Sequence, residues 1–202
     1  MTITIDDTYR FHEYGLFIPS NMIYIGGEQD DENGYERGVD AKCAQQTIKN
    51  LTILQSHNPK EIRIVINCIG GDEYHGLAIY DAIKGLRCKT IGIGIGNVMS
   101  MGSIIIQACT ERYLTKNSTM LIHDGTFGEH VPCEASPHNT LRIAKEGMYL
   151  TELVYEIYHS RMIKNKPNTK IKDIKDMCLH DTFLRPQQAV DLGLADKVIE
   201  KL

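Results

Sequence analysis

Alternating isoleucine and glycine residues between Ile91 and Gly96 constrain the fold of this 202-residue chain more than any other sequence feature. Successive side chains of a strand point to opposite faces, so the isoleucines share one face and the glycines leave the other face bare. A bare face allows another element to pack directly against the strand backbone. We therefore expect a strand that begins at Lys89 and lies in close contact with a neighbouring element.

Strands and helices alternate along the first half of the chain. Short β-rich runs are followed by turns and then by apolar residues at helical spacing. This pattern predicts strand–helix pairs at residues 22–25 and 39–54, at 61–67 and 73–86, and within 89–109. Strands that alternate with helices of this length form a parallel sheet through right-handed crossovers. The predicted fold class is therefore α/β.

The second half of the chain contains shorter elements and one long helix. Two short strands are predicted at 112–115 and 119–123, followed by a loop at 125–137, a helix at 138–162, and a terminal helix and strand within 184–199. The helix at 138–162 is apolar around much of its circumference, which is typical of a helix that meets more than one neighbour. Packing on the core and contact with another subunit both fit this pattern.

Composition and charge exclude several classes of function. The net charge is −4, and the basic residues form no stripe or tail that would bind nucleic acid or an anionic membrane. No segment reaches transmembrane length, and the acidic N-terminus is unlike a signal peptide. Six widely spaced cysteines are typical of reduced thiols. We expect a single cytoplasmic domain over residues 1–202.

The sequence predicts neither a cofactor nor a metal. The glycine run is not a dinucleotide fingerprint, because Asn97 and Met99 occupy the positions where that motif would need its next glycine. His130, Cys133 and His138 are close enough in sequence to suggest a metal site, but a fourth ligand at zinc spacing is missing. These three residues are more simply part of an exposed polar loop.

Ser100 lies where the glycine-containing strand ends and an apolar helix begins at Met101. An isolated serine in this position is most often a helix cap. It also lies beside unpaired backbone N–H groups, which can stabilise the oxyanion that forms when a hydroxyl attacks a carbonyl. A second glycine turn, Gly70-Gly71, follows the preceding strand and could turn further N–H donors outward. Ser100 is therefore a candidate nucleophile.

His123 ends the strand that follows, and it is a candidate general base for Ser100. Any single histidine in such a place is more often a packed or solvated side chain. A base also needs an acid that holds its tautomer. Spacing alone does not choose among the downstream aspartates, which are Asp124, Asp173, Asp176, Asp181, Asp191 and Asp196. The surroundings of Ser100 lack the first glycine of G-x-S-x-G, so an α/β-hydrolase is not expected.

Several stretches together resemble the proteolytic subunit of the Clp protease family of serine peptidases, within the wider crotonase-like superfamily. The similarity extends from about Met22 to Ile199. The matching residues are Ile66 to Gly71, Ala78 to Asp81, Gly96 to Gly102, Arg112 to Leu114, Asn117 to His123, Asp181 to Leu184, Gln188 to Val190 and Gly193 to Asp196.

The resemblance implies a crotonase-like fold of repeated strand–helix units with a protruding handle helix, and a catalytic triad. By position, Ser100 matches the nucleophile of the family, His123 its general base and Asp181 its orienting acid. Gly71 and Met101 match the two residues whose backbone N–H groups form the oxyanion hole. The resemblance also assigns residues 1–21 to an N-terminal axial segment and residues 124–163 to the handle region.

The implied function is hydrolysis of peptides and unfolded proteins inside a homo-oligomeric chamber of stacked heptameric rings, served by an AAA+ ATPase unfoldase. Two alternatives stay open, namely a catalytically weak or inactive assembly subunit and a crotonase-like enzyme that acts on acyl-thioesters. The chain departs from the family pattern at Ile69, where proline is usual, at Asp124-Gly125, where Gln-Pro is usual, and over residues 126–137. Asp124 follows the candidate base directly and either faces it or turns away.

Overall fold

The computed structural model describes residues 3–26, 36, 38–125 and 136–201. Its centre is a mixed sheet in which the strands of the strand–helix units run parallel. The strands are β1 (Leu16–Phe17), β2 (Met22–Gly26), β3 (Glu61–Cys68), β4 (Lys89–Met99), β5 (Glu111–Thr115), β6 (Thr119–Ile122), β7 (Thr182–Leu184) and β8 (Lys197–Ile199). The predicted α/β class and the predicted strands are confirmed, with ends that shift by a few residues.

The eleven-residue strand β4 pairs with three other strands. Its first part lies between β3 and β5, and its last part pairs in parallel with β6 through Asn97, Val98 and Met99. β7 then adds to β6 in the antiparallel direction. The carboxyl ends of β4 and β6 therefore lie side by side, next to the start of β7.

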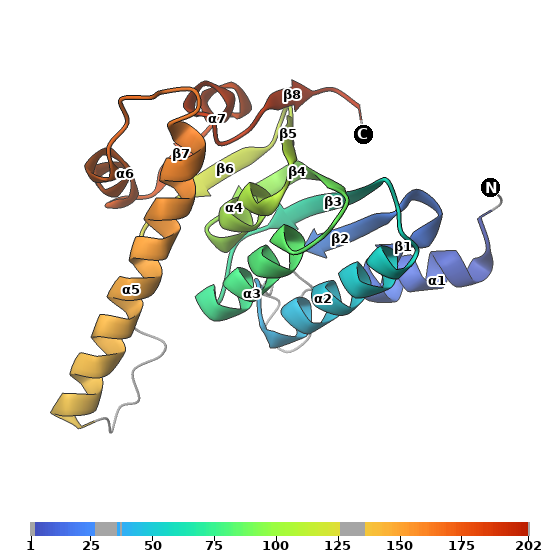
Figure 1. Cartoon of the computed structure of the whole chain (residues 1–202), viewed down its shortest axis with the longest axis horizontal. Helices are drawn as coiled ribbons and strands as arrows, with labels where there is room; N and C mark the ends of the chain where they lie inside the picture. Colours follow the sequence, from blue (N-terminus) through green and yellow to red (C-terminus); the bar gives the residue numbers. More distant parts are fainter. Residues whose placement is uncertain (1–2, 27–35, 37, 126–135, 202) are drawn as a thin grey trace.

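Two long helices cover the sheet beside the first strands (Figure 1). They are α2 (Ala41–Ser56) and α3 (Glu73–Lys84), and each begins at an aspartate whose carboxylate accepts a hydrogen bond from a backbone N–H in the first turn. Asp40 accepts from Cys43 at 2.8 Å, and Asp72 accepts from His75 at 2.9 Å. Such caps satisfy donors that the helix itself leaves unpaired. The predicted helices at 39–54 and 73–86 are confirmed with shifted ends.

The bare glycine face of β4 is covered by the chain that follows it. After the short helix α4 (Met101–Ile105), a 3-10 turn, η2 (Ile106–Ala108), packs on this face. A Cβ atom at Gly92 would lie 2.8 Å from Cγ1 of Ile106 and 2.9 Å from Sγ of Cys109. No larger side chain fits there without displacing these neighbours, and the expected close contact is confirmed.

The long helix α5 (Pro137–Met162) extends away from the sheet, and its N-terminal end projects from the body of the molecule (Figure 1). Its C-terminal half is buried through Val154, Tyr155, Tyr158 and Met162. The two helices that follow, α6 (Ile171–Cys178) and α7 (Pro186–Leu192), lie near this buried end. The predicted long helix is confirmed, and its core packing is confined to the C-terminal half.

A helix near the N-terminus, α1 (Ile5–Tyr14), was not expected from the sequence. Thr4 and Asp7 form a capping box at its start, and Gly15 ends it in a left-handed conformation. None of its residues is buried, so the spacing of its apolar residues is only a weak indication of a helix. The capping residues were the feature that could have predicted this helix.

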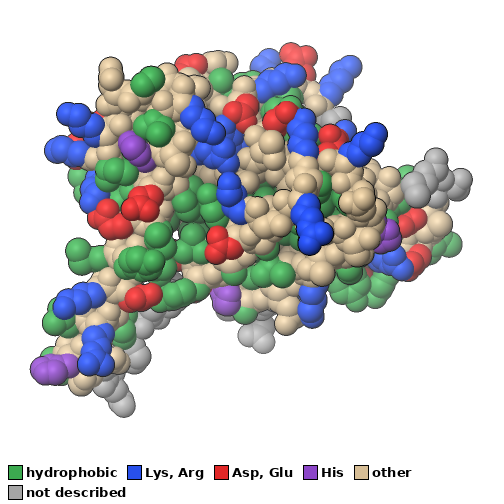
Figure 2. All heavy atoms as spheres, viewed as in Figure 1, with side chains coloured by type: hydrophobic (Ala, Val, Ile, Leu, Met, Phe, Trp, Pro, Cys, Tyr) green, Lys and Arg blue, Asp and Glu red, His purple; other side chains and the backbone are tan. Residues whose placement is uncertain are grey.

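Charges are mixed on the face that Figure 2 shows, where lysine and arginine side chains alternate with aspartate and glutamate. Hydrophobic side chains are also visible along the projecting part of α5. Within residues 3–26, 38–125 and 136–201, no helix combines the length and apolar character needed to cross a membrane.

A buried arginine joins the C-terminal segment to the centre of the sheet. Arg112 on β5 is only 4% exposed, and its guanidinium donates to both carboxylate oxygens of Asp196. It also donates to Oε1 of Gln107 at 2.9 Å and to the carbonyl of Gly193 at 3.1 Å. Partial burial raises the pKa of the Asp196 carboxyl, but the hydrogen bonds and charge of Arg112 outweigh it and hold the pKa below its ordinary value.

We predict that Asp196→Asn destabilises the protein at neutral pH by about 1–3 kcal/mol, because it leaves the charge of Arg112 uncompensated. The loss of stability should be smaller than for a fully buried ion pair, since the Asp196 side chain is 39% exposed and its charge is screened by solvent. A carboxyl whose pKa is lowered by folding contributes stability above its unfolded pKa of about 3.9 and loses it as the pH falls through the folded value.

The measurement is urea unfolding at fixed protein concentration, at neutral pH and again near pH 3. The difference between wild type and Asp196→Asn should shrink in acid. Asp191→Asn on the exposed surface of α7 is the matched control and should change stability by less than about 0.5 kcal/mol. Equal losses in the two variants, or a loss that does not depend on pH, would contradict this role for Asp196.

Candidate active site

The pairing of β4 with β6 brings Ser100 and His123 together. Both strands run in the same direction, and Met99 lies opposite Leu121, so the residues that follow leave the sheet at the same edge. The N–H of Ser100 donates to the carbonyl of Leu121 at 3.0 Å and extends this pairing by one bond. Oγ of Ser100 lies 2.8 Å from Nε2 of His123. The two residues that the sequence predicted as nucleophile and base are therefore within hydrogen-bond distance.

Ser100 occupies a sharp turn between β4 and α4. Its backbone φ of +49° and ψ of −123° are unusual for a residue with a side chain. Its hydroxyl makes no capping bond to α4, so the interpretation of Ser100 as a simple helix cap is not supported. Strained conformations of this kind are concentrated at functional sites, where surrounding contacts hold them in place. Here the turn directs the hydroxyl toward His123.

The pairing of β6 with β7 places Asp181 opposite His123. Ile122 lies across from Thr182 in an antiparallel register, and one further step in this register pairs His123 with Asp181. Oδ1 of Asp181 lies 3.2 Å from Nδ1 of His123. The Asp181 side chain is 61% exposed and that of His123 is 23% exposed in the single chain. Among the aspartates that the sequence left open, Asp181 is the one that contacts the imidazole.

The other candidate aspartates have different partners. Asp124 accepts a hydrogen bond from the hydroxyl of Tyr155 on α5, and its N–H donates to the carbonyl of Cys178 at 2.8 Å. Burial, and then the hydrogen bond to Asp124, raise the pKa of Tyr155. Asp124 is therefore engaged with α5 and α6. The remaining candidates have partners at the start of α6, within α6 and α7, and on β5, namely Lys170 with Asp173, Lys172 with Asp176, Gln187 with Asp191 and Arg112 with Asp196.

The backbone N–H groups of Met101 and Gly71 are those that the family resemblance assigns to an oxyanion hole. Met101 is the first residue of α4, so its N–H has no carbonyl partner within the helix. Gly71 pairs with Val39 in an isolated β-bridge. In this bridge the N–H of Val39 donates to the carbonyl of Gly70, and the N–H of Asp72 donates to the carbonyl of Val39. The N–H of Gly71 takes part in neither of these two bonds. Gly70 and Gly71 have φ values of +113° and +140°, which favour glycine.

A pocket opens beside the serine. Its volume is only about 20 Å³, and its described lining includes Ser100, His123 and Met101, the apolar residues Ile104 and Val154, and Glu73 on α3. The sequence placed Glu73 only in an amphipathic helix and did not indicate that it lies at the site. Its position at the start of α3, directly after the Gly70-Gly71 turn and Asp72, was the available signal.

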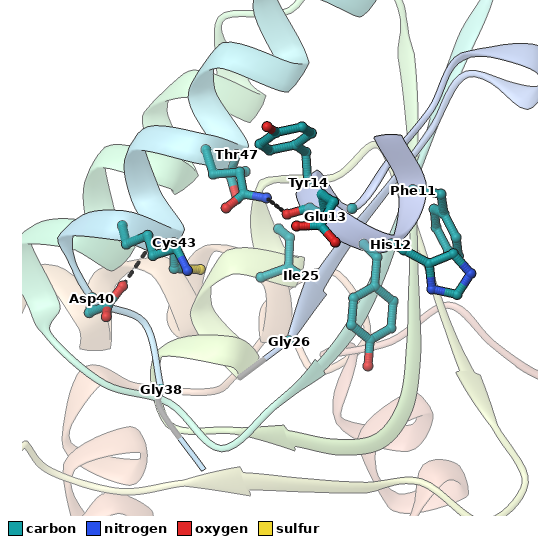
Figure 3. Close-up of a pocket in the computed structure, with 14 residues that line it drawn as sticks. Phe11, His12, Glu13, Tyr14, Ile25, Gly26, Gly38, Asp40, Cys43 and Thr47 are labelled. Carbon is teal, nitrogen blue, oxygen red and sulfur yellow. Dashed lines mark hydrogen bonds between the residues drawn. The ribbon is translucent and has the colours of Figure 1, made fainter. Parts of the chain in front are cut away.

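A second pocket of about 160 Å³ lies between α1, β2 and α2 (Figure 3). Its side chains include His12 and Cys43, a pair that could in principle act as base and nucleophile. Burial is the main cause that raises the pKa of the Cys43 thiol to about 11, so the thiol stays protonated near neutral pH. A protonated thiol is a poor nucleophile. Ser100 and His123 are therefore the better candidates for a reactive site.

The described part of the chain contains no group of three or more His, Cys, Asp or Glu side chains that could hold a metal ion. His130 and Cys133, two of the three residues considered for a metal from the sequence, lie outside the described residues, and so does most of the predicted loop at 125–137. Cys43, Cys68, Cys88, Cys109 and Cys178 are free thiols.

Two comparisons with known proteins identify the family of the chain. A family model described as Clp protease matches residues 34–202. The ATP-dependent Clp protease proteolytic subunit of Deinococcus radiodurans is 34% identical over 191 residues, which cover 93% of this chain and 84% of that protein. The sheet and the repeated strand–helix units fit the crotonase-like fold expected for this family. The chain therefore belongs to the Clp protease family.

Proposed function

We propose that the chain is a serine endopeptidase in which Ser100, His123 and Asp181 form the catalytic triad. The observation that carries the proposal is the continuous contact from Oγ of Ser100 to Nε2 of His123 at 2.8 Å, and from Nδ1 of His123 to Asp181 at 3.2 Å. Because a carboxylate can only accept, Nδ1 carries the imidazole proton and Nε2 is left to accept the proton of the serine hydroxyl.

Hydrolysis then proceeds in two halves. Ser100 attacks the carbonyl carbon of the scissile bond while His123 takes the hydroxyl proton, and the protonated imidazole returns it to the leaving amine. Water attacks the resulting acyl-enzyme, with His123 again acting as base. The N–H groups of Gly71 and Met101 stabilise the oxyanion in both halves. Asp181 holds the tautomer of His123 and stabilises its charged form.

The substrates proposed are peptides and unfolded proteins, which enter a chamber built from copies of this chain. The family match and the Deinococcus radiodurans relative, whose name calls it the proteolytic subunit of an ATP-dependent protease, support this assembly and an AAA+ ATPase partner. Two stacked heptameric rings with α5 as the handle are the proposed arrangement, with residues 1–21 as the axial segment. The free thiols of the described cysteines fit a cytoplasmic location.

The first prediction concerns the nucleophile. A fluorophosphonate should label the native protein at Ser100, and Ser100→Ala should lose both labelling and hydrolysis of a fluorogenic peptide, with the rate falling by about 10³-fold or more. Ser103→Ala is unsuitable as a control because Ser103 contacts Tyr158, so the exposed Ser56→Ala serves instead. An assembled native protein that is not labelled would favour an inactive assembly subunit or an acyl-thioester enzyme.

The second prediction distinguishes the two aspartates nearest the base. Asp181→Asn should lower kcat by about 10²- to 10⁴-fold, because an amide can donate to Nδ1 and favours the wrong tautomer. Asp124→Asn keeps an acceptor for Tyr155 and should change kcat by less than about threefold. Steady-state kinetics on one peptide substrate measure both effects. A larger loss in Asp124→Asn than in Asp181→Asn would overturn the assignment of the acid.

The third prediction concerns assembly. Met148 and Tyr149 on the projecting part of α5 are 68% and 58% exposed, which is typical of side chains that another subunit covers. Native mass spectrometry should give a particle of fourteen 22.8-kDa chains, and Met148→Glu should shift it toward single rings. Lys164→Gln, beyond the end of α5, should leave the mass unchanged. A monomer at micromolar concentration in the wild type would contradict the proposed chamber.

A further inference from the structure

A buried serine joins the turn of the proposed nucleophile to the long helix α5. Ser103 on α4 is 0% exposed, and its Oγ donates to the backbone carbonyl of Ser100 at 2.7 Å. The same Oγ lies 2.6 Å from the hydroxyl of Tyr158 on α5, which is 1% exposed. Because a carbonyl oxygen can only accept, the Ser103 proton is directed to Ser100, and Tyr158 is the donor to Ser103.

Burial keeps Tyr158 in its donor form. It raises the pKa of the phenol above the ordinary value, although the hydrogen bond to Ser103 acts in the opposite direction. The phenol therefore carries its proton across the whole physiological pH range. Hydrogen bonds in such a chain polarise one another, and a buried site makes each of them stronger. The chain from Tyr158 through Ser103 ends on the carbonyl of Ser100.

This carbonyl and the N–H of Met101 belong to one peptide unit. The unit is planar and trans, so the N–H points in the direction opposite to the carbonyl. The carbonyl oxygen also accepts from the backbone N–H groups of Ser103 at 2.9 Å and Ile104 at 3.3 Å. Contacts that fix the carbonyl of Ser100 therefore also fix the direction of the Met101 N–H, which is one of the two proposed oxyanion donors.

The backbone at this position needs support from its surroundings. Ser100 has a φ of +49° and a ψ of −123°, and such sparsely populated conformations persist only where neighbouring contacts hold them. A rotation about ψ of Ser100 would relieve the strain and turn the peptide unit that carries the Met101 N–H. The helix α4 has only five residues, so its own backbone bonds give limited resistance to this rotation.

We propose that Ser103 and Tyr158 are positioning residues that hold the N–H of Met101 in the direction of the oxyanion. This inference rests on the proposed peptidase function. Both side chains act through the peptide unit between Ser100 and Met101 and not on the reacting atoms. Tyr158 brings this support from the buried half of α5, so the long helix contributes directly to the turn of the nucleophile.

A purely structural role for the two hydroxyls would have different consequences. Buried polar groups need partners, so losing one of them would lower the free energy of unfolding in either case. A structural role would leave the rate per labelled active site unchanged. A positioning role instead lowers kcat with little change in KM, because the oxyanion exists only in the transition state and the intermediates.

The first experiment measures kcat and KM of the assembled protein on one fluorogenic peptide, with active sites counted by fluorophosphonate labelling taken to completion. Ser103→Ala should lower kcat by about tenfold or more, since complete loss of an oxyanion donor costs about 10²- to 10³-fold. Its KM should stay within about threefold of wild type. Tyr158→Phe should lower kcat by about threefold, because Ser103 still reaches Ser100.

The double variant Ser103→Ala/Tyr158→Phe should match Ser103→Ala within about twofold, because Tyr158 acts only through Ser103. The inhibition constant of a peptide boronate should rise by the same factor as kcat/KM falls, since its adduct mimics the transition state. Thr90→Val is the matched control. It removes another buried hydroxyl that contacts a second hydroxyl, that of Thr110, and should change neither kcat nor boronate binding by more than about twofold.

The outcomes separate this inference from the peptidase itself. Labelled Ser103→Ala with the kcat of wild type, or with a lower kcat but unchanged boronate binding, would overturn the positioning role and leave the peptidase intact. Tyr158→Phe with the kcat of wild type would remove Tyr158 from the role. A wild-type protein that is neither labelled nor active would overturn both proposals. If Ser103→Ala does not fold because it leaves Tyr158 unpaired, the double variant decides, since it removes both hydroxyls.

Discussion

Two turns of the chain approach each other so closely that only glycine fits between them, and the candidate site depends on this contact. A Cβ atom at Gly70 would lie 2.4 Å from Cβ of Ser100. The φ of +113° at Gly70 also disfavours any other residue. This approach holds the turn after β3 against the turn after β4. The start of α3 follows this turn directly, and Glu73 there lines the same pocket as Ser100.

The sheet then brings the remaining groups to the same edge. Because β4 is long, it pairs with β5 near its start and with β6 near its end, and the second pairing places His123 beside Ser100. The antiparallel addition of β7 places Asp181 on the other side of the imidazole. Groups from three regions of the chain thus meet through backbone register. Strand ends hold side chains more rigidly than free loops do, which favours a preorganised site.

The glycine face of β4 and the positions of Ser100 and His123 at the ends of elements could be predicted from periodicity and turns. The choice of acid needed the family resemblance, because β7 has only three residues and no periodic pattern, and only its register identifies Asp181. The orientation of Asp124 depends on Tyr155, which is distant in sequence. Glu73 was missed because an exposed face of an amphipathic helix and the wall of a pocket look alike in sequence.

The most direct test of the triad with its oxyanion donors is an experimental structure of the protein with a peptide boronate, whose tetrahedral adduct mimics the intermediate of acyl transfer. The predicted result is a covalent bond from boron to Oγ of Ser100, with one boronate oxygen within hydrogen-bond distance of the N–H groups of Gly71 and Met101. Nε2 of His123 should remain in contact with the adduct. A boronate bound away from Ser100, or attached to it with its oxygen directed away from both N–H groups, would contradict the proposed mechanism.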